Sequence, residues 1–166
     1  MKLIPLGGRL GKGKFTQVDD EDYEHLNQFY WQLNDRGYVQ GRYRRFKREQ
    51  WRNVKMHRII IGVPRGVSVD HIDGNKTDNR RRNLRPCNQT QNAGNQKLSS
   101  ANTSGFKGVS FKKDLGQWRA KIHYIDTDYH LGYFPTPVTA AMAYDIAARD
   151  IFGDFARLNF PNGIHG

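Results

Sequence analysis

The polar stretch at residues 69–95, VDHIDGNKTDNRRRNLRPCNQTQNAGN, constrains the fold of this chain more than any other part. Glycine and asparagine at residues 74–75 indicate a turn. Short runs on either side predict strands at residues 67–71 and 84–86, and a short polar helix is expected at residues 88–97. The expected unit is therefore strand, turn, strand and helix.

Four side chains of this stretch form a candidate catalytic constellation. Asp70 and His71 are adjacent. Asn83 follows His71 by twelve residues, and Asn92 comes nine residues later. Metal-assisted cutting of a phosphodiester needs an oxygen ligand such as Asp70, a proton acceptor such as His71 and a further ligand such as Asn92. The alternative is a turn that contains a hydrogen-bonded histidine without a catalytic role.

Composition restricts the partners and the size of the protein. The chain has 166 residues, a net charge of +11 and 37 % hydrophobic residues. This length supports one domain or two small ones, and strong basicity is typical of proteins that bind nucleic acid. The alternative is a basic surface that only serves solubility. No apolar run of about 18 residues occurs and Cys87 is the only cysteine, so we expect no membrane span, no internal disulfide and a cytoplasmic location.

Residues 1–55 are expected to form a basic, β-rich N-terminal region. The pattern predicts strands at residues 15–18, 30–33 and 38–42, and a short helix at residues 19–27 with acidic residues in its first turn. Asparagine, aspartate and glycine between the last two strands predict a hairpin turn.

A basic run interrupted by aromatic residues continues from this region into the next. It predicts contacts with nucleic-acid phosphates, and the alternative is a solvated hairpin edge that its charge protects from pairing. Its members are Arg42, Arg44, Arg45, Lys47, Arg48, Arg52, Lys55 and Arg58.

We expect three further segments after the N-terminal region. Residues 56–98 form the domain that carries the constellation and begin with a short apolar helix at residues 56–61. His57 in that helix is expected to pack or to contact phosphate rather than to bind a metal. A small, polar linker is expected at residues 99–103, followed by a C-terminal domain at residues 104–162.

The C-terminal domain shows a different pattern. Strand-like runs occur at residues 106–111, 117–124 and 129–134, and a threonine–proline pair opens an alanine-rich helix at residues 137–152. Turns are expected between these runs at residues 114–116 and 126–128. The middle run has a period of two, which predicts one buried face with Trp118, Ala120 and Ile122 and one basic face with Arg119, Lys121 and His123.

The motifs HRII, VDHIDGN, NRRRNL and NQTQN resemble those of the HNH endonucleases, especially the branch common among phage and intron-encoded homing endonucleases. The resemblance covers residues 56–97 and implies a ββα-metal fold around one divalent cation. It implies Asp70 and Asn92 as metal ligands, His71 as the general base and Asn83 as the residue that orients the histidine through its backbone carbonyl. An oxygen-rich site suits Mg²⁺, with Mn²⁺ as the alternative, better than Zn²⁺.

Charged residues of the same motifs have separate expected roles. Arg80, Arg81 and Arg82 are expected to contact DNA phosphates, although a solvated side chain is the alternative for at least one of them. Asp73 and Asp78 are expected to be turn residues rather than metal ligands.

The C-terminal motifs GFKGV, GQW, LGYF, AAxAYD and LNF resemble the plant ethylene-response-factor (AP-two type) DNA-binding domain. The resemblance covers residues 104–161 and implies a three-stranded antiparallel sheet packed on one helix, with the outer face of the sheet in the DNA major groove. The fold class expected for the whole chain is therefore α+β: a ββα-metal nuclease domain followed by this sheet and helix.

The residues expected on the DNA-reading face follow from the alternation. They are Ser110, Lys112, Arg119, Lys121, His123 and His130. Ser110 replaces a usual Arg of the plant pattern and His130 replaces a usual Trp, so the plant target sequence does not transfer to this chain.

The sequence thus predicts a metal-dependent, site-directed endonuclease of the HNH homing type that acts on double-stranded DNA in a bacterial host cell. No obligatory protein partner is evident, and we expect the protein to act as a monomer or as a dimer. The first alternative is a non-cutting DNA-binding regulator with a relic HNH fold. The second is an RNA-binding protein, which a groove-reading sheet disfavours because A-form RNA hides its major groove.

Overall fold

The computed structural model describes residues 1–43, 50 and 52–163. Contacts divide the chain into two compact units, residues 1–87 and residues 88–166. Most of the expected basic run, namely Arg44, Arg45, Lys47 and Arg48, lies outside the described residues.

The first unit begins with an antiparallel hairpin of β1 (Lys2–Pro5) and β2 (Phe15–Val18), with the short helix α1 (Gly8–Gly11) in the connection. The helix α2 (Asp20–Leu26) follows, with three acidic residues in its first turn, where the helix dipole favours negative charge. The expected strand at residues 15–18 and the helix after it are confirmed. The sequence does not predict β1 and α1, because such short runs show no hydrophobic period.

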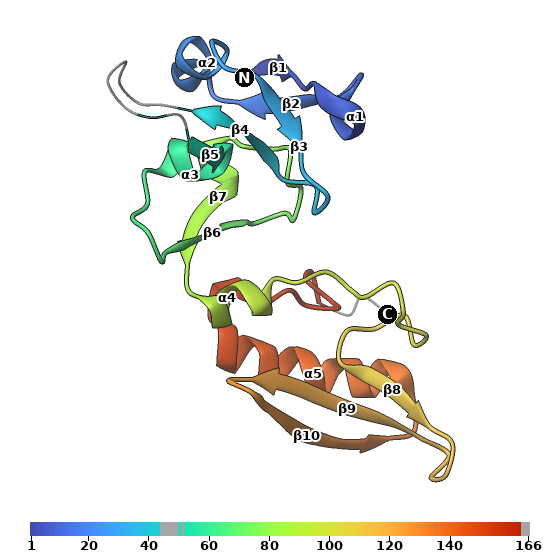
Figure 1. Cartoon of the computed structure of the whole chain (residues 1–166). Helices are drawn as coiled ribbons and strands as arrows, with labels where there is room; N and C mark the ends of the chain where they lie inside the picture. Colours follow the sequence, from blue (N-terminus) through green and yellow to red (C-terminus); the bar gives the residue numbers. More distant parts are fainter. Residues whose placement is uncertain (44–49, 51, 164–166) are drawn as a thin grey trace. The chain divides into compact units, whose positions relative to one another are not determined.

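The strands β3 (Trp31–Leu33), β4 (Val39–Tyr43) and β5 (Arg52–Lys55) form an antiparallel sheet in this order (Figure 1). The expected hairpin turn joins β3 to β4, and the Asn34 side chain there accepts hydrogen bonds from the backbone amides two and four residues later. The helix α3 (Met56–Ile61) follows β5 directly and has the bounds that the sequence predicts.

An antiparallel pair of strands, β6 (Ser68–His71) and β7 (Leu84–Cys87), completes the first unit. The long connection between them ends in the single 3-10 turn η1 (Arg81–Asn83). This pair corresponds to the two strands expected around the polar stretch.

One hydrophobic cluster holds the first unit together. Its buried members come from both the N-terminal region and the β6–β7 segment: Ile4, Leu6, Val18, Leu26, Trp31, Val39, Met56, Ile60, Val69 and Leu84. Because these residues share a core, residues 1–55 fold together with the segment that carries the candidate site.

The second unit starts with α4 (Gln89–Gly94), which has a capping box between Asn88 and Gln91. Residues 99–103, expected as a linker, belong to this unit. They include a turn in which the Asn102 side chain donates to the carbonyl of Phe106 at 2.9 Å.

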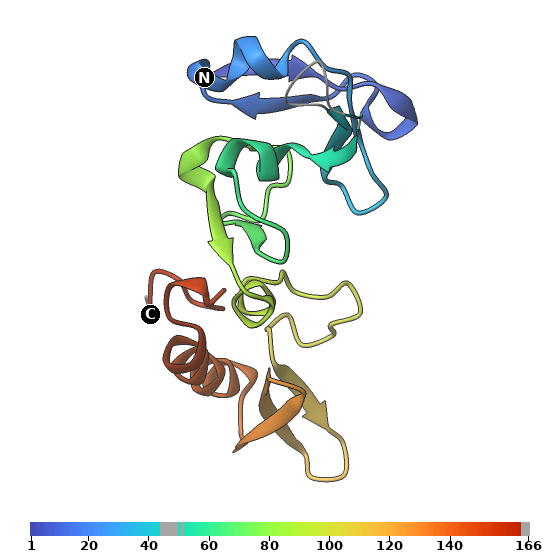
Figure 2. The same ribbon diagram turned by 60° about the vertical axis from the view of Figure 1, so that its left-hand side comes forward.

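A three-stranded antiparallel sheet and one long helix form the body of the second unit. The strands β8 (Val109–Lys112), β9 (Gln117–Tyr124) and β10 (Thr127–Phe134) pair in this order. Figures 1 and 2 both show α5 (Pro137–Phe152) along one face of the sheet, with η2 (Gly153–Phe155) after it. The helix has the expected bounds and Thr136 caps its N-terminus, since its hydroxyl accepts a hydrogen bond from the Thr139 amide at 3.1 Å.

The turn between β9 and β10 differs from the expectation at residues 126–128. Ile125 and Asp126 form it, with φ values of 42° and 59°. A two-residue turn with positive φ at both positions matches the twist of the strands, so Thr127 and Asp128 are already part of β10.

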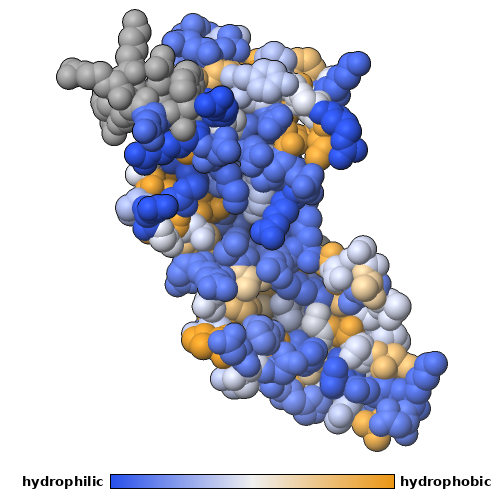
Figure 3. All heavy atoms as spheres, viewed as in Figure 1, coloured by the Kyte–Doolittle hydropathy of each residue, from blue (hydrophilic) through white to orange (hydrophobic). Residues whose placement is uncertain are grey.

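The core of the second unit lies between the sheet and α5. Alanines on the helix, including Ala140, Ala141 and Ala148, are buried and permit a close approach to the sheet. In the part of the chain that the structure describes, no helix is both long and apolar enough to cross a membrane. Figure 3 shows a mostly hydrophilic face with separate apolar patches.

Gly108 provides a test of this packing. It has a φ of 77°, and a Cβ atom added there would lie 2.0 Å from the Tyr144 ring. Gly108→Ala should therefore combine backbone strain with overpacking and destabilise the second unit by roughly 2–5 kcal/mol in urea-induced unfolding.

Gly116→Ala is the matched control, because Gly116 also has positive φ but no atom within 4 Å of the added Cβ. Strain alone predicts a loss of about 1–2 kcal/mol. Equal losses in the two variants would contradict the packing described for Gly108.

Candidate active site

The end of β6 places Asp70 and His71 in the interior, with 6 % and 3 % of their surfaces exposed. Across the ladder, Asp70 pairs with Arg85 and His71 pairs with Leu84. The Arg85 guanidinium donates from Nε and Nη2 to Asp70 Oδ2 at 3.1 and 2.9 Å. A buried carboxylate is costly without such a partner, so this pair holds the carboxylate of Asp70 in place on β6.

His71 is held as a neutral imidazole. Burial lowers the pKa of His71 below its ordinary value of 6.5, while a hydrogen bond with Asn79 and nearby carboxylates oppose the shift. Its Nε2 atom lies 3.3 Å from Asn79 Oδ1. A neutral imidazole at pH 7 can accept a proton from water, as a general base must.

Two aromatic rings pack against His71. The ring centroids of His57 and His71 are 5.0 Å apart in an edge-to-face arrangement, and that of Tyr38 lies 5.9 Å from His71. His57 is itself buried and contacts Tyr38. The packing role expected for His57 therefore agrees with its position in the structure.

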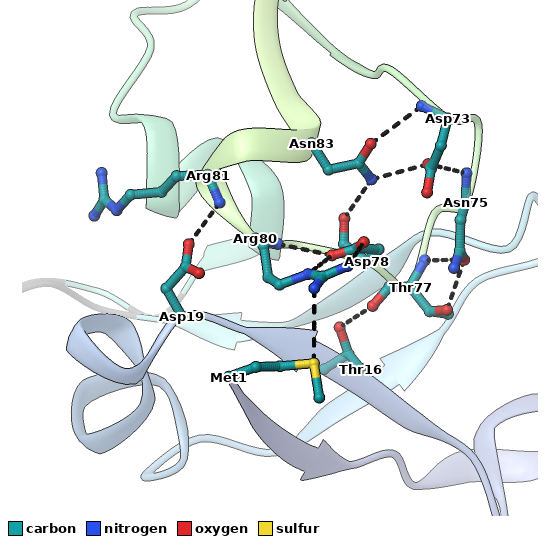
Figure 4. A network of polar contacts seen from close by, with 10 residues as sticks. All are labelled: Met1, Thr16, Asp19, Asp73, Asn75, Thr77, Asp78, Arg80, Arg81 and Asn83. Carbon is teal, nitrogen blue, oxygen red and sulfur yellow. Dashed lines mark hydrogen bonds and ion pairs between the residues drawn. The ribbon is translucent and has the colours of Figure 1, made fainter.

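Asn83 closes the loop between β6 and β7 (Figure 4). Its carboxamide nitrogen donates to Asp73 Oδ1 and to the carbonyl of Asp78, both at 2.9 Å, and its oxygen accepts from the Asp73 amide. Its backbone carbonyl accepts from the Ile72 amide, next to His71, at 2.9 Å. Asp73 lies in a turn of this loop, as expected, whereas Asp78 forms an isolated bridge with Gln17. The expectation that the Asn83 carbonyl orients the histidine stays a prediction.

The three consecutive arginines differ in their surroundings. Arg80 forms a two-point ion pair with Asp78, which Figure 4 shows, and Arg81 forms one with Asp22 at 2.7 Å. Arg82 is exposed and forms no ion pair or hydrogen bond with a residue that the structure describes. Phosphate contact stays a prediction for all three, and Arg82 is the one whose charge is not already paired in this way.

The expected metal ligands come from different units, with Asp70 on β6 and Asn92 on α4. Within the described ranges, no group of three or more His, Cys, Asp or Glu could hold a metal ion. Carboxylate and carboxamide oxygens are donors of the kind that Mg²⁺ takes, and a site shared by Asp70 and Asn92 stays a prediction.

Sequence reasoning does not find several residues of the site, among them Arg85, Asn79 and Thr16. Asn79 is fully buried beside His71, although its turn-rich surroundings predict an exposed loop. Thr16 on β2 is fully buried and accepts a hydrogen bond from Asn79 Nδ2 at 2.8 Å. No motif links positions so far apart in the chain.

The second unit presents the expected basic face on the side of its sheet away from α5. The helix covers Ala120 and Ile122, so the residues that alternate with them on β9 lie on the other side. Cross-strand pairs bring the remaining residues to the same side: Ser110 with Arg119, Lys112 with Gln117, His130 with Lys121.

Asp128 adds a negative charge to this basic face. It pairs with Lys121 at 2.6 Å and with His123 at 3.0 Å. These two partners hold the pKa of the Asp128 carboxyl below its ordinary value. Two of the six expected DNA-contacting side chains thus already have a partner within the sheet.

The burial of His57 predicts how stability depends on pH. Burial and the neighbouring His71 lower the pKa of His57 from 6.5 to about 3. Between these values the unfolded chain binds more protons than the folded chain, so stability falls as pH drops through this window and is unaffected above it. The slope from one histidine is at most about 1.4 kcal/mol per pH unit.

His57→Phe should reduce this slope in urea unfolding measured from pH 7 to pH 4, because the replacement has no proton to bind. His25→Phe is the control, since His25 is exposed on α2. Identical pH profiles for the native protein and His57→Phe would contradict the burial of a neutral His57.

Comparison with known proteins first gives a plant relative. The dehydration-responsive element-binding protein 2A of Arabidopsis thaliana is 45 % identical over 58 residues, which are 34 % of this chain and 17 % of the plant protein. No solved structure matches the chain.

Further similarities indicate one family. A family model described as HNH endonuclease matches residues 54–93. Protein 3.8 of Escherichia phage T7 is 30 % identical over 116 residues, or 69 % of this chain and 95 % of the phage protein. An uncharacterised HNH endonuclease of Acanthamoeba polyphaga mimivirus is 30 % identical over 155 residues, or 90 % of this chain and 76 % of the viral protein. This chain therefore belongs to the HNH endonuclease family.

Proposed function

We propose that this chain is a metal-dependent DNA endonuclease of the homing type that hydrolyses phosphodiester bonds in duplex DNA. The observation that carries the proposal is a buried, neutral His71 at the end of β6, next in the chain to the buried Asp70. Such an imidazole can activate water, and such a carboxylate can hold a hard cation. Membership of the HNH endonuclease family supports the same reaction and the same substrate.

Each residue of the site has one proposed role. His71 takes a proton from the water whose oxygen attacks phosphorus. Asp70 and Asn92 hold one Mg²⁺, with Mn²⁺ as the alternative. The bound cation supplies neutralisation of the phosphate and stabilisation of the leaving 3′ oxygen. Asn83 keeps the β6–β7 loop in the form that presents His71.

We further propose that the sheet of the second unit selects the DNA site. Phosphate contacts alone discriminate little between DNA sequences, whereas a sheet in the major groove can contact base edges. The basic face of β8, β9 and β10 and the similarity to a plant element-binding protein support this role. Ser110 and His130 depart from the plant pattern, so we expect the target DNA sequence to differ from that of the plant domain.

Cleavage of supercoiled DNA in Mg²⁺ tests the proposed reaction. The native protein should convert it to nicked DNA as a monomer, or to linear DNA if two active sites act together. His71→Ala should reduce the cleavage rate by about 10²–10⁴-fold, because it removes the general base, and EDTA should abolish cleavage.

His25→Ala is the matched control, since it removes an exposed histidine from the same unit and should cleave at the native rate. Tight, salt-sensitive binding without cleavage on a panel of targets would favour the non-cutting regulator instead. Cleavage by His71→Ala at the native rate would exclude His71 as the base.

Arg119 tests the role of the sheet, because it lies on the basic face and its Nε is buried without a hydrogen-bond partner among the described residues. Arg119→Ala should weaken binding to the cleaved site by about 1–3 kcal/mol, measured by fluorescence anisotropy. Arg149→Ala removes an arginine from α5, on the opposite side of the sheet, and should bind as the native protein does. Equal losses of affinity in the two variants would contradict the proposal that this face of the sheet binds DNA.

A further inference from the structure

We propose that Thr16 and Asn79 form a hydrogen-bond relay that fixes which nitrogen of His71 carries the proton, so that Nδ1 is the atom that accepts a proton from water. This inference rests on the proposed function, in which His71 is the general base. It assigns Thr16 and Asn79 as positioning residues and gives the N-terminal hairpin a part in the reaction.

The first step of the relay is the direction of the Thr16 hydroxyl. Its oxygen lies 2.8 Å from the backbone carbonyl of Thr77. A carbonyl can only accept, so the hydroxyl proton belongs to this bond. The other possible acceptor, the sulfur of Met56 at 3.9 Å, also draws the proton away from Asn79.

The second step fixes the orientation of the Asn79 amide. The Asn79 side chain lies 2.8 Å from Thr16 Oγ1, and that oxygen has already donated its only proton. Asn79 must therefore donate through Nδ2, and its Oδ1 then points towards His71. The backbone amide of Asn79 donates to the carbonyl of Gln17 at 2.9 Å, which anchors the residue on β2.

The third step sets the tautomer of the imidazole. Asn79 Oδ1 lies 3.3 Å from His71 Nε2 and can only accept a hydrogen bond. His71 Nε2 therefore carries the hydrogen, and the lone pair of the neutral ring is on Nδ1.

The reaction then balances at named atoms. An O–H bond of water breaks and its proton forms an N–H bond at His71 Nδ1. The water oxygen bonds to phosphorus as the bond from phosphorus to the 3′ oxygen breaks. The 3′ oxygen leaves with the electron pair of that bond and takes a proton from solvent water, which gives the 3′-hydroxyl. The positive charge that develops on the ring strengthens the bond from Nε2–H to Asn79 Oδ1.

Backbone hydrogen bonds hold β2 against the β6–β7 loop and so support the relay. The Gln17 amide donates to the Thr77 carbonyl at 2.9 Å, next to the Asn79–Gln17 bond, and Gln17 forms a parallel bridge with Asp78. The backbone of the N-terminal hairpin therefore holds Thr16 at a fixed position relative to Asn79.

Nitrogen-15 NMR of the imidazole in the full-length protein at neutral pH tests the relay directly. The His71 signals, assigned by their loss in His71→Ala, should show a protonated Nε2 and an unprotonated Nδ1 in the native protein and in Thr16→Ser. In Thr16→Val and Asn79→Leu, which remove an acceptor from the relay, the signals should move towards a mixture of tautomers.

Cleavage kinetics complete the experiment. Thr16→Val and Asn79→Leu should lower the single-turnover cleavage rate by roughly 10- to 100-fold at unchanged DNA affinity, less than the loss of the base itself. Thr16→Ser should cleave at the native rate, because it keeps the hydroxyl.

The two measurements separate the relay from the proposed function. A protonated Nδ1 in native His71 overturns the relay, whatever the cleavage assay gives, and this measurement needs no variant to fold. The expected tautomer in a protein that cleaves none of the DNA tested would count against the nuclease proposal and leave the assigned hydrogen bonds intact. An unchanged tautomer in both Thr16→Val and Asn79→Leu would also overturn the relay.

Discussion

Burial of polar groups at the β6–β7 hairpin is the constraint on which the first unit depends. Asp70, His71, Asn79 and Asn83 are all buried, and each unpaired polar group of this kind costs about 1–3 kcal/mol. The partners come from different places: Arg85 from β7, Thr16 from β2, and the loop itself for Asn83. The hairpin therefore has its described form only inside the complete unit.

The N-terminal region follows from this constraint. A ββ hairpin alone is too small to bury a carboxylate and an imidazole, and the shared cluster around Trp31 and Met56 supplies the missing core. The acidic first turn of α2 adds a second connection, since Asp19 accepts a hydrogen bond from the Arg81 amide at 2.7 Å. Residues 1–55 thus complete the interior of the candidate site rather than stand apart from it.

Sequence patterns predict the elements well where a local signal exists. Helix α5 is marked by its threonine–proline start and by Gly153 at its end, and β9 by strict alternation, so both appear where expected. The adjacent Asp70 and His71 are equally visible, because their chemistry and spacing are local.

Contacts between distant residues escape such patterns. Thr16 and Asn79 are 63 residues apart, and only the packing of β2 on the loop reveals that they touch. The position of Asp128 is missed for another reason. A turn at residues 126–128 would place Asp128 outside the sheet, whereas the observed two-residue turn brings it onto the basic face beside Lys121. Long-range packing decides the first case, and the register of one hairpin decides the second.

The most direct test of the central claim is cleavage of the preferred DNA site in ¹⁸O-labelled water, followed by mass spectrometry of the new ends. Attack by a water that His71 activates, with departure of the 3′ oxygen, places one ¹⁸O atom in the new 5′-phosphate and leaves an unlabelled 3′-hydroxyl. Ends without the label, or a phosphate on the 3′ side, would contradict the mechanism that we assign to Asp70 and His71.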